Sequence, residues 1–283
     1  MGKVTVPVKY QELFFWNGSL LVKQKNKWGV IDKNNRVIFP LFYDQVQIKS
    51  NNLLILKKER AHAIAFYKGN IIRLKHYDKI EEAMPYLMVT NNNRMGLLDS
   101  TGRQLIPCKY EQIYSHDLDR GFFIVKQDNL CGFIDLKTGA KSKIAFDMVS
   151  SYISNDRIAF EQGKLYGFLN AKGKVVIQAK YDLVEPFRGR ITPVKKDGKW
   201  GFISKKGKLI IPYQYDWASS YWNNGKAKVV KDRLEGLVND RGKEVVPCEY
   251  RPVRYNHKRK IYLFKKDGVE YRLNKSGKII KND

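Results

Sequence analysis

The sequence predicts an all-β protein made of about eight stacked copies of a unit of about 35 residues. Two observations carry this prediction. A short pattern centred on glycine returns at nearly constant spacing, and each copy holds three short apolar stretches separated by turn residues. No segment keeps a helical period for more than two turns, and aromatic residues, which favour strands, make up 13% of the chain.

The repeat is clearest where Lys199-Trp200-Gly201-Phe202-Ile203 resembles Lys27-Trp28-Gly29-Val30-Ile31. Ala63 takes the glycine position in a further copy, six residues before the turn residue Gly69. Tyr271 takes it in a degenerate eighth copy. The glycines of the other copies follow at separations of 36, 35, 34 and 35 residues, at Gly96, Gly132, Gly167, Gly201 and Gly236.

The unit that begins at Tyr181 shows the expected elements in order. Two strands joined by a hairpin turn are followed by a second turn and a third strand, at Ile191–Val194, Asp197-Gly198, Trp200–Ile203, Lys205-Lys206-Gly207 and Leu209–Ile211. Proline cannot donate to a strand ladder, so we expect Pro212 to end the third strand. We expect the glycine inside the second strand to leave space that a neighbouring aromatic ring fills.

Recurrent aromatic residues predict where the copies pack. Trp28 and Trp200 precede the repeat glycine, and we expect both to be buried. An aromatic residue also opens each unit, at Tyr10, Tyr43, Tyr77, Tyr110, Phe146, Tyr181, Tyr215 and Tyr250. A single unit cannot bury its own apolar face, so the copies must stack, and residues 1–283 are predicted to form one array without a separate catalytic domain.

The two ends of the chain bear on whether the array closes. Lys3–Pro7 and Lys278–Ile280 both resemble the third strand of a unit, whereas a closed propeller usually completes one blade from both termini. We therefore expect an open, curved or solenoid-like array of three-stranded repeats. A closed, propeller-like ring is the alternative.

These patterns resemble the bacterial WG-repeat family, also called KWG repeats. Trp28-Gly29 and Trp200-Gly201 are close to the family pattern, as is Lys180-Tyr181-Asp182. The resemblance extends over essentially the whole chain, although other residues replace Trp at Met95, Cys131 and Glu235. It implies an interaction module with no characteristic enzymatic activity and no catalytic residues to carry over.

The residues show no constellation for catalysis, metal binding or a cofactor. Cys108 and Cys248 occupy equivalent places in two units, Cys131 replaces an aromatic residue, and no pair of cysteines has the close spacing of zinc ligands. The four histidines are scattered, and motifs for phosphate loops, serine hydrolases or zinc proteases are missing. Aspartates recur with the repeat beside turns, where they usually bind backbone N–H groups. We expect no enzyme activity.

Charge is the strongest functional signal in the sequence. The chain has 53 Lys and Arg against 28 Asp and Glu, a net charge of +25. Such a surplus exceeds what solubility requires and attracts polyanions, of which nucleic acid is the commonest. The alternative explanation is that lysines of the repeat lie on solvated turns.

The basic residues depart most from the repeat in residues 251–283, where 11 Lys or Arg face 3 Asp or Glu. Arg251 replaces the acidic residue that follows the opening Tyr elsewhere, and interleaved Arg and Tyr suit phosphate contact with stacking. Lysines at stacked hairpin turns would add a continuous basic stripe along one edge. The predicted nucleic-acid-binding residues are Arg251, Arg254, Tyr255, Lys258, Arg259, Lys260, Lys195, Lys196, Lys199, Lys205, Lys206, Lys208, Lys228, Lys231 and Arg233.

The predicted partner is nucleic acid, contacted through its backbone, because backbone contacts need no sequence-reading element. Such a module suits an accessory subunit of a nucleoprotein effector, for example a CRISPR-type nuclease. A scaffold that docks an acidic protein is the alternative. Met1–Tyr10 has no signal-peptide pattern, and no apolar run approaches the length of a membrane span, so we expect a cytoplasmic location.

Overall fold

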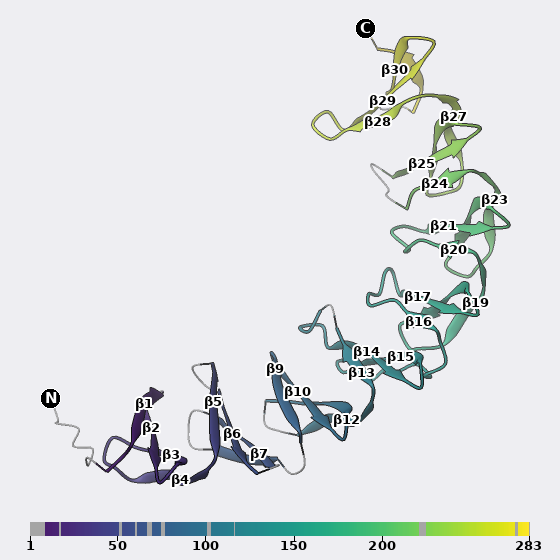
Figure 1. The fold of residues 1–283 in the computed structure, drawn as a ribbon. Coiled ribbons are helices and arrows are strands. Elements are labelled where there is room, and N and C mark those ends of the chain that lie inside the picture. The colour runs from purple at the N-terminus through teal and green to yellow at the C-terminus, as the bar shows by residue number, and fades with distance from the viewer. Residues whose placement is uncertain are drawn as a thin grey trace. The chain divides into compact units, whose positions relative to one another are not determined.

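A computed structural model describes residues 9–16, 18–50, 53–59, 61–66, 70–74, 77–100, 103–115, 117–220, 225–274 and 277–282. In these ranges the chain forms 31 strands and no helix, and so no helix that could cross a membrane. The strands form eight antiparallel sheets, each built from consecutive strands, which we number sheet 1 to sheet 8 in chain order (Figure 1). The predicted all-β repeat fold is confirmed.

The chain divides into two compact units, each of which contains several repeats. The first unit covers residues 1–121 and 125–128, and the second unit covers 122–124 and 129–283. Sheets 1 to 3 lie in the first unit. Their strands are β1 (Glu12–Trp16), β2 (Ser19–Gln24), β3 (Lys27–Ile31), β4 (Val37–Tyr43), β5 (Gln45–Ser50), β6 (Leu53–Lys58), β7 (Ala61–Phe66), β8 (Asn70–Leu74), β9 (Lys79–Ala83), β10 (Tyr86–Asn91), β11 (Arg94–Leu98) and β12 (Gln104–Tyr110).

The division between the units falls within sheet 4, and sheets 5 to 8 lie in the second unit. The strands of sheet 4 are β13 (Gln112–Tyr114), β14 (Phe122–Gln127) and β15 (Leu130–Asp135). Those of sheets 5 to 8 are β16 (Met148–Val149), β17 (Arg157–Gln162), β18 (Leu165–Asn170), β19 (Val175–Tyr181), β20 (Leu183–Val184), β21 (Ile191–Lys196), β22 (Lys199–Ser204), β23 (Leu209–Tyr215), β24 (Trp217–Ala218), β25 (Lys226–Lys231), β26 (Leu234–Asn239), β27 (Glu244–Tyr250), β28 (Val253–Asn256), β29 (Ile261–Lys266), β30 (Val269–Leu273) and β31 (Ile279–Lys281).

Seven of the eight sheets have four strands, one more than the sequence predicts. The additional strand begins two or three residues after the opening aromatic residue. In β16, β20 and β24 it is only two residues long, too short to show an alternating pattern in the sequence. The opening Tyr itself ends the last strand of the preceding sheet, as Tyr215 ends β23.

The repeat glycine faces a bulge in the last strand of its sheet. Trp200 pairs with Tyr215 and Phe202 pairs with Ile211, so Gly201 alone lies opposite three residues of β23. A Cβ at Gly201 would lie 2.6 Å from the carbonyl oxygen of Ile211. The backbone of the bulge and the Tyr213 ring, whose Cδ1 would lie 2.8 Å from the same Cβ, together fill the space beside Gly201, so the expected aromatic ring is present but is only part of the filling.

The same bulge explains the position of proline in the last strand. Pro212 lies within β23, not at its end, because it falls in the bulge, where the missing N–H breaks no ladder hydrogen bond. Where glycine is replaced, at Ala63 and at Tyr271, the register to the last strand is continuous and has no bulge. Glycine and bulge therefore occur together.

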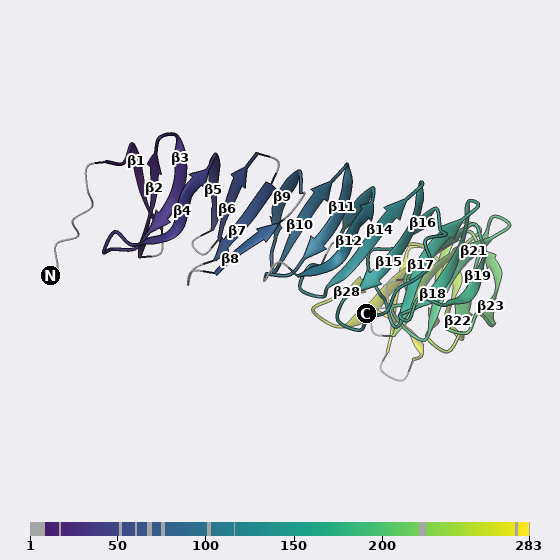
Figure 2. The same ribbon diagram turned by 90° about the horizontal axis from the view of Figure 1, so that it is seen from below.

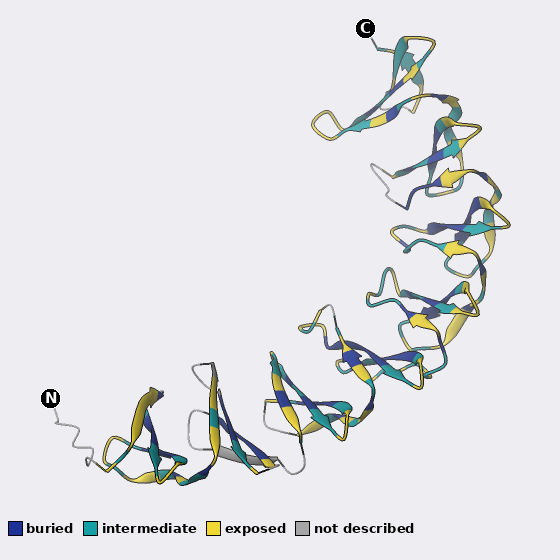
Figure 3. Ribbon diagram, in the orientation of Figure 1, coloured by how far each residue is buried: buried dark blue, intermediate teal, exposed yellow. Residues whose placement is uncertain are grey.

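In the second unit, hydrophobic cores lie between consecutive sheets, as the stacking argument requires. Figure 2 shows sheets 1 to 3 of the first unit as successive layers, and Figure 3 marks the buried residues along the strands. Between sheets 6 and 7, for example, Trp200 and Tyr215 pack with Val229. Trp200 is buried as predicted, but Trp28 is only half-buried, against Phe14 at 5.9 Å between ring centroids. Most opening aromatics are also buried, at Tyr43, Tyr110, Phe146, Tyr181, Tyr215 and Tyr250.

Parts of two sequence expectations, the N-terminal strand and one turn glycine, are not tested by the structure. Lys3–Pro7 and the turn residue Gly69 lie outside the described residues. The C-terminal segment does form a last strand, β31, paired with β30. The choice between an open array and a closed ring stays a prediction.

Candidate nucleic-acid interface

Each sheet of the second unit has two chemically different edges, which the strand register defines. In sheet 6, Lys196 pairs with Lys199 beside the hairpin turn, whereas Ile191 pairs with Ser204 at the far end. We call the first the hairpin edge and the second the loop edge. A six-residue strand spans about 20 Å, so the two edges are well separated.

The predicted basic residues divide between these two edges. Those on the hairpin edge, beside two-residue turns or directly after Tyr250, are Lys195, Lys196, Lys199, Lys231, Arg233 and Arg251. Those on the loop edge are Lys205, Lys206, Lys208, Lys258, Arg259 and Lys260. The predicted single stripe is therefore wrong, because consecutive turns of an antiparallel meander alternate between the two ends of its strands.

Two of the predicted residues are engaged by other side chains of the protein, one between sheets and one within a sheet. The ammonium of Lys199 pairs with Asp216, which connects sheet 6 to sheet 7, and this hydrogen bond raises the pKa of Lys199. Lys228 lies 3.3 Å from Glu235 and sits over the Trp217 ring, with its ammonium 5.9 Å from the ring centroid. Periodic ion pairs of the first kind occur elsewhere, for example between Lys27 and Asp44. The sequence pattern could not separate these lysines from exposed ones.

Arg254 and Tyr255, which the sequence predicts to contact phosphate and base together, do not share one face of the sheet. Both lie on β28, where successive side chains point to opposite faces of the sheet. Arg254 is exposed, whereas Tyr255 is half-buried and packs on Tyr262, with ring centroids 4.8 Å apart. One ligand strand therefore cannot contact both side chains from the same face.

The loop edge of the second unit contains an open basic cavity of about 640 Å³. Its cations come from two segments of sheet 6, the loop before β21 and the turn after β22. Four cations, one carboxylate and three small residues line it. They are, in that order, Arg188, Arg190, Lys205 and Lys206, then Asp240, then Asn155, Gly189 and Ser204. Among the described residues that line the cavity, Asp240 is the one acidic side chain, and its Oδ2 lies 3.9 Å from Nε of Arg190.

Hydrogen bonds between sheets fix the backbone that carries these cations. The Arg157 guanidinium donates to the carbonyl oxygen of Lys205 at 2.9 Å and 3.1 Å. The Asn155 amide donates to the carbonyl oxygens of Phe187 at 2.8 Å and Gly189 at 3.4 Å. A backbone already held in place loses less conformational freedom when a ligand binds.

Arg188 and Arg190 were not among the binding residues that the sequence predicted. Their position within the repeat was the signal that could have identified them. They lie in the segment before the first long strand, which an antiparallel meander returns to the same edge as Lys205 and Lys206.

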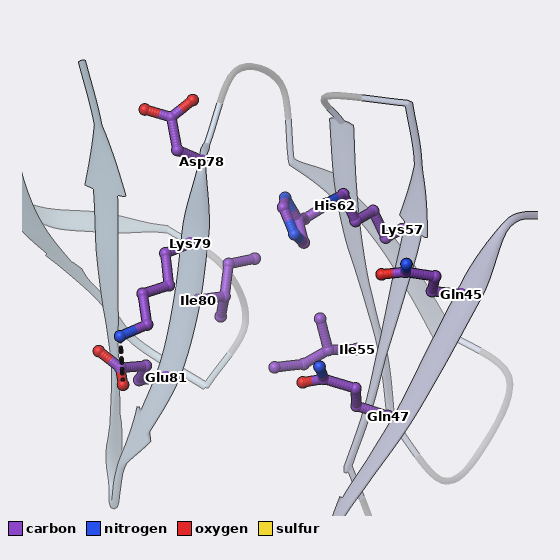
Figure 4. A pocket seen from close by; sticks show the side chains of 9 residues that line it. All are labelled: Gln45, Gln47, Ile55, Lys57, His62, Asp78, Lys79, Ile80 and Glu81. Carbon is purple, nitrogen blue, oxygen red and sulfur yellow. Dashed lines mark ion pairs between the residues drawn. The ribbon is translucent and has the colours of Figure 1, made fainter. Parts of the chain in front are cut away.

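A smaller cavity of about 280 Å³ in the first unit has a different character (Figure 4). His62, whose Nδ1 lies 2.6 Å from the carbonyl oxygen of Tyr77, faces Asp78 and Ile80 across the space between sheets 2 and 3. Lys79 pairs with Glu81 at 2.9 Å. The charges that line this smaller cavity are of both signs and partly paired, so the cavity does not concentrate positive potential. Among the described residues, no three His, Cys, Asp or Glu side chains are placed to hold a metal.

Comparison with known families identifies the repeat. A family model described as a WG containing repeat matches residues 28–59, 95–131, 166–200 and 200–234. The chain belongs to the WG β-repeat family. Each matched segment of this WG-repeat protein begins at the position before the repeat glycine, at Trp28, Met95, Tyr166 and Trp200.

No curated protein sequence matches the chain. Among solved structures, a eukaryotic initiation factor is 10% identical over 94% of this chain and 85% of its own, with a TM-score of 0.39. The dihydro-heme d1 dehydrogenase NirN is 10% identical over 98% and 76%, with a TM-score of 0.33. Hsv2p of Kluyveromyces lactis is 12% identical over 84% and 97%, with a TM-score of 0.31. At this similarity none of the three bears on the function of the WG-repeat chain.

Proposed function

We propose that this WG-repeat protein is a non-catalytic module that binds nucleic acid through its phosphate backbone at the loop edge of its second unit. The basic cavity carries the proposal. Four cations converge there on one carboxylate-poor surface, and they belong to neighbouring loops whose backbone is already fixed. The net charge of +25 adds a long-range attraction toward any polyanion.

The chemistry of the cavity suits phosphate. Arg188 and Arg190 offer planar guanidinium groups that can donate two parallel hydrogen bonds to one phosphate. Lys205 and Lys206 supply compact charges on the adjacent turn. Further cations continue along the loop edge in sheet 8, in the exposed turn at Lys258, Arg259 and Lys260. A backbone that presents regularly spaced phosphates can contact several such groups at once.

Phosphate contacts position a nucleic acid without reading its sequence. A module of this kind would therefore act beside a protein that supplies specificity, such as a nucleoprotein effector complex in the cytoplasm. An acidic protein surface offers similar charges but not the regular spacing of phosphates. The two partners can be compared directly in one assay.

The test is a fourfold variant in which Arg188, Arg190, Lys205 and Lys206 are changed to Gln. If these residues touch phosphates, affinity for duplex DNA falls to a similar extent for unrelated sequences. The slope of log affinity against log salt flattens by roughly 0.9 for each phosphate that the variant no longer neutralises. The measurement is fluorescence anisotropy over a salt series, with polyglutamate as the acidic polypeptide in a parallel series.

The matched control removes the same charge from the hairpin edge, by changing Lys195, Lys196, Lys231 and Arg233 to Gln. These residues lie on sheets 6 and 7, and their removal keeps the overall net charge of the two variants equal. An equal loss of affinity in both variants would reduce the effect to net charge and contradict the proposed cavity. Tighter binding to polyglutamate than to DNA would favour the acidic protein partner instead.

A further inference from the structure

A pocket of about 250 Å³ lies between sheets 7 and 8, apart from the basic cavity. It is enclosed by the first two strands of sheet 7 and the first two strands of sheet 8, and most of its lining is aromatic. The lining residues are Trp217, Ser219, Lys228, Val253, Tyr255, His257 and Tyr262. We call it the aromatic pocket.

One of its aromatic residues, Trp217, departs from the repeat. Trp217 stands two residues after its opening Tyr, where the other repeats have Glu12, Gln45, Lys79, Gln112, Met148, Leu183 and Pro252. Tyr255 stands five residues after its opening Tyr, where six repeats have a residue that is not aromatic and the first repeat has Phe15. Trp217 is therefore not part of the repeated core. Trp217 is also 45% exposed, compared with 7% for the core residue Trp200.

The equivalent position between sheets 2 and 3 provides an internal comparison. That cavity, shown in Figure 4, is lined by Gln45 and Gln47 where the aromatic pocket has Trp217 and Ser219. The groove between sheets therefore occurs at two places in the array, and Trp217 distinguishes the one between sheets 7 and 8. A side chain that the fold does not need at this position suggests a ligand.

Hydrogen bonds and ring contacts hold the pocket wall in place. Tyr255 packs edge-on against His257, with centroids 4.9 Å apart, and also against Tyr262. The Tyr262 hydroxyl donates to the carbonyl oxygen of Lys226 at 3.1 Å. Glu235 accepts the N–H of Val253 at 2.7 Å and pairs with Lys228, whose ammonium lies over the Trp217 ring. The rings therefore form a preformed surface.

We propose that the aromatic pocket takes the ring of an unpaired nucleobase, so that the preferred ligand is single-stranded nucleic acid. This inference rests on the proposed function and narrows its ligand class. Aromatic side chains stack on any base, and a volume below the ~300–1,000 Å³ of drug-sized pockets suits one planar ring. The exposed turn that follows His257 carries Lys258, Arg259 and Lys260 and can contact the adjoining phosphates. A base within a duplex is already stacked and cannot enter.

The experiment compares Trp217→Ala with wild type on three probes: an oligothymidylate, an abasic strand of equal length and a duplex. Losing one stacked base should lower affinity for oligothymidylate roughly 5- to 150-fold, while affinity for the abasic strand and the duplex stays unchanged. Leu183→Ala is the matched control, because Leu183 occupies the same repeat position and is 44% exposed. Leu183→Ala should change none of the three affinities. Trp217→Phe should retain most of the wild-type affinity for oligothymidylate.

Different failures separate the two proposals. Equal wild-type affinity for oligothymidylate and the abasic strand, or an unchanged affinity in Trp217→Ala, overturns the aromatic pocket as a base site and leaves backbone binding intact. No binding of wild type to any probe overturns both proposals. If thymidine monophosphate displaces the oligomer and binds as tightly, the ligand is a free nucleotide, and the assignment to a strand is wrong.

Discussion

The carboxylate of Asp216 accepts the backbone N–H of Asp232, 16 residues further along the chain, at 2.8 Å. The same carboxylate pairs with the ammonium of Lys199 in the preceding sheet. One side chain thereby fixes a hairpin turn in sheet 7 and connects it to sheet 6. Corresponding aspartates at Asp44, Asp78, Asp147 and Asp182 accept turn N–H groups in other sheets. These aspartates thus stabilise turns, as expected, but each stabilises a turn that lies about 15 residues further along the chain and not the turn next to it.

The first prediction follows from this connection. The hydrogen bond from Lys199, followed by that from the Asp232 N–H, lowers the pKa of Asp216 below its usual 3.8. A carboxyl whose pKa is lower in the folded state stabilises the fold above its unfolded pKa and ceases to do so as the pH falls through the folded pKa. Asp216→Asn should therefore have a lower thermal midpoint than wild type at pH 7, and the difference should shrink below pH 3.8. Circular dichroism over a pH series measures it.

Asp197→Asn is the control for this prediction. It removes the same charge from the same edge, at a left-handed turn position, φ 51°, which Asn tolerates. Its midpoint should stay close to that of wild type. If the two variants behave alike, charge and not the hydrogen bond with Asp232 governs the effect of Asp216.

The second prediction concerns the glycine and its bulge. Gly201→Ala places a Cβ 2.6 Å from the carbonyl oxygen of Ile211 and should destabilise the protein by about 1–3 kcal/mol, as overpacking usually does. Gly198→Asn is the control, since Gly198 has a positive φ that Asn tolerates and no atom lies within 4 Å of its Cβ position. Urea unfolding of both variants measures the effect. An unchanged Gly201→Ala midpoint would contradict the close approach.

The third prediction separates the two tryptophans of the repeat. Trp200→Ala should cost about 3–5 kcal/mol because the ring is buried between sheets, and Trp28→Ala should cost less because Trp28 is half-buried. Unfolding midpoints give the comparison. If Trp200→Ala melts like wild type but loses DNA binding, the ring belongs to a binding site and the packing assignment is wrong.

The fourth prediction concerns the C-terminal cations, which the structure separates into two groups. Changing Lys258, Arg259 and Lys260 to Gln should weaken binding of single strands and flatten the salt slope, because these residues share the loop edge with the basic cavity. Changing Arg251 and Arg254 to Gln should have little effect, since Arg251 lies at the hairpin edge. Both variants should fold normally, because exposed substitutions cost little. The reverse order of effects would assign the interface to the hairpin edge.

The sequence by itself determined the repeat, three of the four strands in each and most of its aromatic anchors. These follow from period alone, because a position that must be buried in every copy carries the same kind of residue in every copy. The periodic aspartates were also correctly assigned to turns. The glycine was recognised, but only part of its physical reason was, since a bulge depends on the register between two strands.

Only the tertiary structure decided which cations share a surface. Lys199 and Lys205 are six residues apart, yet they lie at opposite ends of β22, whereas Arg188 and Lys206 are 18 residues apart and line one cavity. Trp217 and Tyr255 come together because consecutive sheets pack face to face. Proximity along an antiparallel meander depends on where each strand turns, so the sequence determines the character of the surface charge, and the folded chain determines its location.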